Sequence, residues 1–153
     1  MMCTMTSLLL VLSAIVNGLY AGFMLTFLIA IMPGLAALPD EQFTAAMRRF
    51  NEKVPGPVFL VLFLGVVALP VAVLVSGVGG ESRLPVVVAG LACAVAGHLI
   101  TIAGNIPLNK ALADAEGGDD SAARTAFESR WNTLHRVRTV FSLAACALLT
   151  VAL

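Results

Sequence analysis

Residues 57–76 read PVFLVLFLGVVALPVAVLVS, a stretch of twenty positions without a charged side chain. About 20 apolar residues are enough for an α-helix to cross the ~30 Å hydrocarbon core of a bilayer. The bilayer core offers no water to an unpaired backbone, so a spanning segment of this kind forms a helix. Pro70 lies inside the stretch and lacks a backbone N–H, and we therefore expect it to kink this span.

Three further stretches are also long and predominantly apolar, at residues 6–32, 84–105 and 134–153, and of these only the last contains charged side chains. The chain of 153 residues is 59% hydrophobic and only 12% charged, whereas an ordinary soluble domain is about 25% charged. So few charged side chains cannot cover the surface of a soluble protein of this size. The sequence therefore predicts an all-α protein, a single integral membrane domain over residues 1–153, built as a bundle of four transmembrane helices. With four spans, both termini lie on the same side of the bilayer.

The connection after the first span is predicted to contain a short helix over residues 40–53. Asp40 is suited to the N-cap position at its start. Phe43, Met47 and Phe50 follow at helical spacing and form one apolar stripe. A short helix with one apolar face is typical of a segment that lies in the membrane interface.

The other two connections differ in length and polarity. Residues 77–83 (GVGGESR) are predicted to form a flexible turn. The third connection is the longest and most polar, and its residues 117–120 (GGDD) interrupt the chain. From residue 121 onward the pattern predicts a helix that continues directly into the fourth span.

Basic residues are unevenly distributed along the chain. Eight of the nine Lys and Arg residues belong to the first and third connections and the helix start beside the third, and only Arg83 belongs to the second. The positive-inside rule therefore places the first and third connections in the cytoplasm and both termini outside. The net charge is zero, so no broad basic face is available and no nucleic-acid partner is expected.

Polar side chains within the apolar spans are the candidates for function, because polarity inside a bilayer is costly. They recur at steps of three and four, which places each set on one helical face. The candidates are His98, Thr101, Asn105 and Asn109 in the third span, Trp131, His135, Arg138 and Ser142 in the fourth, and Asn17 and Tyr20 in the first. Consecutive antiparallel helices are usually neighbours. The two histidines are therefore predicted to face each other in a polar pocket near the cytoplasmic end.

Simpler roles remain open for several of these residues. Trp131, His135 and Arg138 lie near the expected membrane interface, where aromatic and basic side chains act as anchors. The two asparagines of the third span are placed to cap a helix end. His98 and His135 are a conceivable ligand pair for a metal or haem, but they lack a third ligand and a recognised spacing, and no metal site is predicted.

No familiar catalytic motif is present. The sequence lacks Gly-x-Ser-x-Gly, a phosphate-binding glycine loop and His-Glu-x-x-His. No Asp or Glu lies inside a predicted span, which disfavours a proton-coupled transporter.

Six short motifs follow one another along the chain: GLYAGF at 18–23, MPGL at 32–35, RRFN at 48–51, PVF at 57–59, NIPLN at 105–109 and WNTLHRVRT at 131–139. Together they resemble the anthrone oxygenase-like family of small membrane proteins. Each motif is short, but their order and spacing cover nearly the whole chain.

The resemblance implies an oxidoreductase that works without a cofactor. Fungal members of the family use molecular oxygen to convert an anthrone into an anthraquinone. By this resemblance His135, whose imidazole ordinarily titrates near pH 6.5, is expected to be the catalytic base, and Arg138 to stabilise a phenolate or peroxide. Trp131 is expected to stack on the substrate ring. The residues expected to bind substrate are Trp131, Asn105, Asn109, His98, Asn17 and Tyr20.

Two other kinds of function remain open from the sequence. The first is a non-catalytic membrane scaffold or a homo-oligomer that assembles through small-residue faces such as Gly18-x-x-x-Gly22. The second is a metal- or haem-binding protein that uses His98 and His135. The expected partners are the lipid bilayer and a lipophilic small molecule. The expected location is the plasma membrane of a bacterium.

Overall fold

The computed structural model describes residues 2–77 and 83–153, and every regular element in that part of the chain is a helix. Four helices are long and apolar enough to cross a membrane: Met5–Ala36, Pro57–Val75, Leu84–Asp114 and Asp120–Val151. The predicted all-α bundle of four transmembrane helices is therefore confirmed, and the protein is an integral membrane protein. Apart from Gly77 and Arg83, the predicted turn at 77–83 lies outside the described residues.

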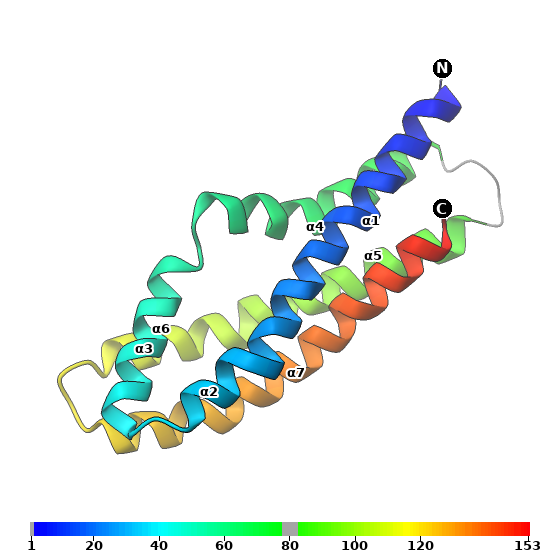
Figure 1. Ribbon diagram of the computed structural model, residues 1–153. Coiled ribbons are helices and arrows are strands. Elements are labelled where there is room, and N and C mark those ends of the chain that lie inside the picture. Colours follow the sequence, from blue (N-terminus) through cyan, green and yellow to red (C-terminus); the bar gives the residue numbers. More distant parts are fainter. Residues whose placement is uncertain (1, 78–82) are drawn as a thin grey trace.

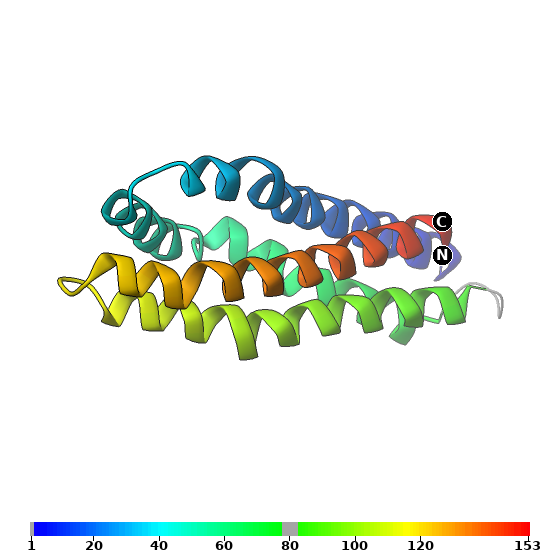
Figure 2. The same cartoon turned by 90° about the horizontal axis from the view of Figure 1, so that it is seen from below.

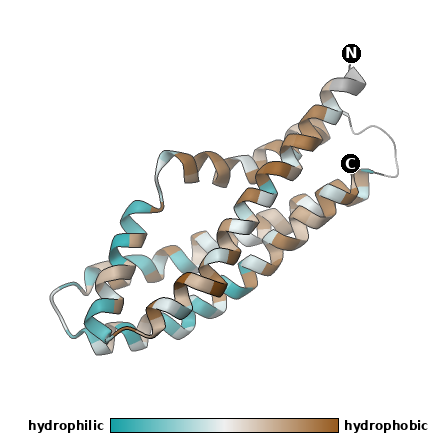
Figure 3. Ribbon diagram, in the orientation of Figure 1, coloured by the Kyte–Doolittle hydropathy of each residue, from teal (hydrophilic) through white to brown (hydrophobic). Residues whose placement is uncertain are grey.

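The long helices run side by side, and both termini lie at the same end of the bundle (Figures 1 and 2). Helix α5 (Leu84–Ile100) packs along α7 (Asp120–Val151), and α1 (Met2–Thr26) packs against both α7 and α4 (Pro57–Val75). At the opposite end, α3 (Asp40–Lys53) contacts α7 and has the bounds expected for the short helix after the first span. Hydrophilic residues concentrate at this α3 end (Figure 3).

The first and third spans each contain one π-helical turn that ends two residues before a proline. Segment η1 (Phe27–Ile31) precedes α2 (Met32–Ala36), and η2 (Thr101–Asn105) precedes α6 (Ile106–Asp114). Pro33 and Pro107 lack an N–H and crowd the carbonyl four residues earlier, so a regular α-turn is disfavoured there. A π-turn accommodates this conflict without ending the helix. The third span consequently continues to Asp114, beyond the end predicted at residue 105.

The proline inside α4 has a different partner. Pro70 cannot donate to the carbonyl of Val66, and the side chain of Asn17 donates to that oxygen instead, at 3.3 Å. The same Asn17 amide also donates to the carbonyl of Ser13 at 2.9 Å. Asn17 is 1% exposed and joins α1 to α4.

Glycines make the close contact between the third and fourth spans. Gly90, Gly97 and Gly104 are spaced by seven residues, and a methyl group on any of them would meet atoms of α7 within 3.6 Å. Small residues allow two membrane helices to approach in this way. Gly18 similarly faces Cys146 of α7 at 3.5 Å, whereas nothing lies within 4 Å of a side chain added at Gly22.

Two arginines, one buried and one half-buried, close the α3 end of the bundle. Arg48 of α3, which is 6% exposed, pairs with Asp120 at 3.2 Å and donates to the carbonyls of Leu112 and Ala115. Arg124 of α7 pairs with Asp40 at 3.0 Å and also donates to backbone carbonyls after the first span. These contacts hold α3 and the third connection against α7.

Candidate functional site

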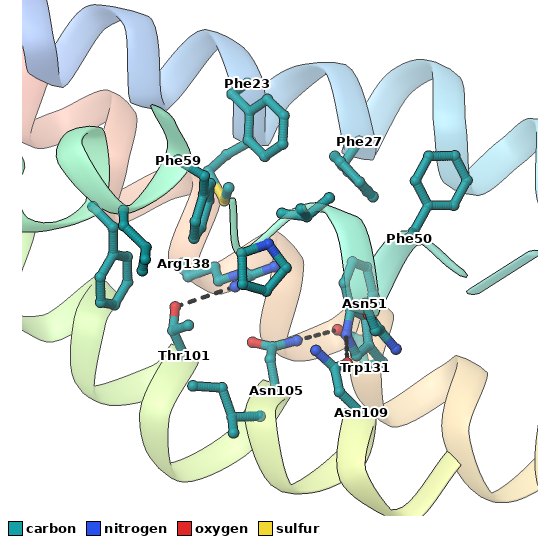
Figure 4. Close-up of a pocket in the computed structure, with 16 residues that line it drawn as sticks. Phe23, Phe27, Phe50, Asn51, Phe59, Thr101, Asn105, Asn109, Trp131 and Arg138 are labelled. Carbon is teal, nitrogen blue, oxygen red and sulfur yellow. Dashed lines mark hydrogen bonds between the residues drawn. The ribbon is translucent and has the colours of Figure 1, made fainter. Parts of the chain in front are cut away.

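A cavity of about 170 Å³ lies inside the bundle where α3 ends and α4 begins (Figure 4). An apolar cavity of about 150 Å³ is sufficient to hold benzene, so this one has room for at least one aromatic ring. Side chains from all four spans and from α3 line it: Phe23, Met24, Phe27, Phe50, Asn51, Val54, Pro55, Phe59, Leu60, Phe63, Thr101, Asn105, Ile106, Asn109, Trp131 and Arg138.

The lining separates into two walls of different chemistry. Five phenylalanines from α1, η1, α3 and α4 form an aromatic wall: Phe23, Phe27, Phe50, Phe59 and Phe63. Five side chains with hydrogen-bonding groups, three from the third span and two from the fourth, form a polar wall: Thr101, Asn105, Asn109, Trp131 and Arg138. A mainly apolar cavity with a few convergent polar groups is the usual form of a small-molecule site.

Arg138 is the charged group of the polar wall. Its Nε–H donates to Nδ1 of His135 at 3.0 Å, and one Nη1–H donates to the Thr101 hydroxyl at 3.2 Å. The guanidinium carbon also lies 5.4 Å from the centre of the Trp131 ring. Among the described residues no acidic side chain forms an ion pair with Arg138. The cation is therefore held in place by neutral groups at the edge of the cavity.

His135 lies behind Arg138 and does not line the cavity. Its side chain is fully buried, and Nε2 lies 3.0 Å from the carbonyl oxygen of Met24. Arginine Nε–H only donates and a carbonyl only accepts, so the neutral ring with its proton on Nε2 satisfies both contacts. Both nitrogens of the expected base are thus already engaged, and the ring orients Arg138.

Trp131 and the two asparagines form a second hydrogen-bonded group. The indole N–H of Trp131 donates to Asn109 Oδ1 at 2.8 Å, and Asn105 Nδ2 donates to the Trp131 carbonyl at 3.3 Å. The Trp131 ring is stacked on His135, with 4.7 Å between ring centres. One face of the indole is therefore already covered by His135.

Two polar atoms at the cavity have no partner among the described residues. They are Oδ1 of Asn105, which accepts hydrogen bonds, and Nδ2 of Asn51, which donates them. Buried polar atoms are nearly always paired in folded proteins. Their presence on the walls of a cavity indicates positions where a ligand would supply the missing partner.

Three other predicted site residues lie outside the cavity lining. His98 faces α4, where its ring stacks on Phe63 at 4.0 Å and Nε2 lies 2.6 Å from the Phe63 carbonyl. Tyr20 packs its ring 6.0 Å from that of His98. Asn17 has the structural role at Val66 described above. The two histidines thus contact different helices, His98 on α4 and His135 on α1.

The described residues also contain no group of three or more His, Cys, Asp or Glu side chains that could hold a metal ion. Of the residues expected to act in catalysis or to bind substrate, four line the cavity: Trp131, Asn105, Asn109 and Arg138.

The aromatic wall and Asn51 were not predicted as site residues. Phenylalanine in a membrane span carries no sign of whether it faces lipid or a cavity. Asn51 is a polar residue of a polar helix, so nothing in its local sequence distinguishes it. The available signal was position, since Phe23, Phe59 and Asn51 all belong to the motifs that carry the family resemblance.

The helices and the cavity together define an integral membrane protein with an aromatic-lined cavity inside its four-helix bundle. A family model described as anthrone oxygenase matches residues 43–148, which is more than half of the chain. The chain therefore belongs to the anthrone oxygenase family. The match includes every residue of the polar wall. No curated protein and no solved structure matches the chain.

Proposed function

We propose that this protein is a cofactor-independent oxygenase of a lipophilic aromatic compound of the anthrone type. The observation that carries the proposal is the guanidinium group of Arg138, buried at the wall of an aromatic cavity without an acidic partner among the described residues. A cation in this setting favours a ligand that carries negative charge on an oxygen atom. Membership in the anthrone oxygenase family supports the same class of substrate.

The reaction that we propose exchanges a ring CH2 group for a carbonyl. Molecular oxygen supplies one atom to the new C=O group, and its other atom leaves as water with the two hydrogens of the methylene. The four electrons lost by carbon are those gained by oxygen, so no further reductant is required. Loss of a proton makes the aromatic substrate an electron-rich anion that can pass an electron to oxygen.

Arg138 would promote this step by binding the anionic oxygen. Groups that are preorganised to stabilise developing charge in a site without water often provide the largest single contribution to catalysis. We assign His135 a positioning role, in place of the base expected from the resemblance, because Arg138 and Met24 occupy its two nitrogens. The substrate would then reach the cavity already ionised, its proton having been lost to bulk water outside the site.

Oxygen uptake by the purified protein in detergent tests this proposal. With a hydroxylated anthrone, and after subtraction of spontaneous oxidation, the native protein should consume oxygen and produce the anthraquinone. Replacement of Arg138 by Leu should reduce the rate by about 10²–10³-fold, the usual effect of removing one such stabilising group.

Arg136→Leu is the matched control. Arg136 carries the same charge two residues away on α7, and its side chain is exposed. This variant should keep the native rate. Equal rates in the Arg138→Leu and Arg136→Leu proteins would rule out the proposed role of Arg138, and no uptake by the native protein would rule out the oxygenase.

A further inference from the structure

Asn105 presents an unused hydrogen-bond acceptor at the polar wall. Its side chain is 1% exposed, and the Nδ2 group donates to the carbonyl of Trp131. The Oδ1 atom has no partner among the described residues. Burying an acceptor without a donor is unfavourable, so a donor on a ligand would be favoured at this atom.

The bond to Trp131 fixes which way the amide points. If the amide were turned over, its oxygen would face the carbonyl oxygen of Trp131, and neither atom can donate. The acceptor is therefore held on the other side of the amide. In Figure 4 this oxygen points toward the side of the cavity where Arg138 and Thr101 lie.

The two groups have complementary requirements. Arg138 can only donate hydrogen bonds, so it binds an anionic or carbonyl oxygen. The free oxygen of Asn105 can only accept, so it needs a ligand atom that carries a hydrogen. A ligand with a single oxygen anion would satisfy Arg138 and leave Asn105 unpaired.

We propose that Asn105 determines specificity by accepting a hydrogen bond from a neutral hydroxyl group of the ligand. The preferred ligands are aromatic compounds with two oxygen substituents, one ionised at Arg138 and one protonated at Asn105. The inference rests on the proposed function only in taking the ligand to be an aromatic oxygen anion. The inference concerns ligand binding alone and does not require catalytic turnover.

The only tryptophan in the chain, Trp131, lines the cavity and provides a direct measure of binding. Quenching of its fluorescence would be titrated with dihydroxynaphthalenes of different ring patterns and with the corresponding naphthols, under nitrogen. The native protein should bind at least one diol about tenfold more tightly than its naphthol, the effect of one well-placed buried hydrogen bond. In Asn105→Leu the diol and its naphthol should bind about equally, an affinity ratio of about one.

The quantity compared is the ratio of diol affinity to naphthol affinity, measured within each protein. Asn105→Leu also removes the hydrogen bond to the Trp131 carbonyl, and an effect of that loss on both affinities cancels in the ratio. Asn17→Leu is the matched control, since Asn17 is equally buried and has an unpaired Oδ1 but lies outside the cavity lining. It should keep the native ratio. Asn105→Ala serves as a second variant if Asn105→Leu does not fold.

A native protein without a diol preference, or a preference that survives in both Asn105 variants, would overturn the inference. The result is separable from the oxygenase proposal. A ratio lost in Asn105→Leu without any oxygen uptake would support the binding role alone. Uptake in the native protein with unchanged ratios would support the oxygenase and refute the role of Asn105.

Discussion

The side chains of Arg138 and His135 depend on each other inside the fourth span. An ionised group at this depth needs hydrogen bonds from its surroundings, because water is absent from the bilayer core. His135 supplies one acceptor and is itself held by the Met24 carbonyl on α1. Thr101 of η2 supplies the other and donates its own proton to the Gly97 carbonyl at 2.9 Å. The direction of the guanidinium group is thus set by three different helical segments.

This geometry predicts different effects for two substitutions of His135. Asparagine keeps an acceptor near the position of Nδ1, whereas leucine removes it. We expect His135→Asn to retain oxygen uptake within about tenfold of the native rate. His135→Leu should lose about 10–100-fold, the usual effect of losing a hydrogen bond to a charged group.

The pH dependence of uptake provides the second measurement for this pair. Asparagine does not titrate, so an unchanged pH profile in His135→Asn would indicate that His135 positions Arg138. Complete loss of activity in both variants would instead indicate that the imidazole itself transfers a proton.

At the scale of helices, Pro70 and Asn17 illustrate how one span depends on another. The proline leaves the Val66 carbonyl without its usual donor, and Asn17 of α1 donates to it from outside the helix. The sequence predicts that Pro70 leaves a backbone carbonyl without its donor, but it does not indicate which side chain donates to that carbonyl instead. Asn17 therefore resembled a ligand-binding residue until its neighbours were known.

The coupling can be measured with a double-mutant cycle. Asn17→Ala should lower the free energy of unfolding in detergent by about 1–3 kcal/mol, because it leaves a buried carbonyl unpaired. Pro70→Ala restores an N–H four residues after Val66, so the same Asn17 substitution should cost less in that background. Thr150→Ala is the control, since its hydroxyl is exposed and bonds only to its own helix. Additive effects of the Asn17 and Pro70 substitutions would refute the link.

The elements themselves could largely be predicted from the sequence. A long, predominantly apolar segment has one low-energy form in a bilayer, the helix, and the four spans were predicted on that basis. The two π-turns could not be predicted, because Pro33 and Pro107 are equally suited to ending a helix. The third span extends past residue 105 because a π-turn before Pro107 continues the helix, whereas a helix end there would have stopped it.

At the scale of the whole molecule, the basic residues of the α3 end predict its orientation. Arg48, Arg49 and Lys53 belong to α3, and Lys110 belongs to α6, which lies at the same end of the bundle (Figure 1). By the positive-inside rule we expect this end in the cytoplasm and the termini outside.

Reporter fusions test this orientation. Alkaline phosphatase joined after Leu153 should be active outside the cytoplasm, and a fluorescent protein at the same site should stay dark. A fusion after Glu116, in the third connection, should give the reverse pattern. Fluorescence from the fusion after Leu153 would show that the orientation is inverted.

The site was predictable only where helical periodicity operates. Spacing placed Asn105 and Asn109 on one face of the third span, and Trp131 and Arg138 on one face of the fourth. Which faces meet depends on packing between spans, and a single sequence contains no record of it. His98 follows the same spacing as Asn105, yet its ring lies against Phe63 of α4.

The glycine contacts between the third and fourth spans have a consequence for how substrate range can change. Gly90, Gly97 and Gly104 hold the two helices that carry the polar wall at a fixed separation. A substitution there shifts every hydrogen-bonding group at once. The aromatic wall comes largely from α3 and α4, whose side chains can be exchanged one at a time. New ring shapes are therefore easier to acquire by mutation than a new arrangement of oxygens.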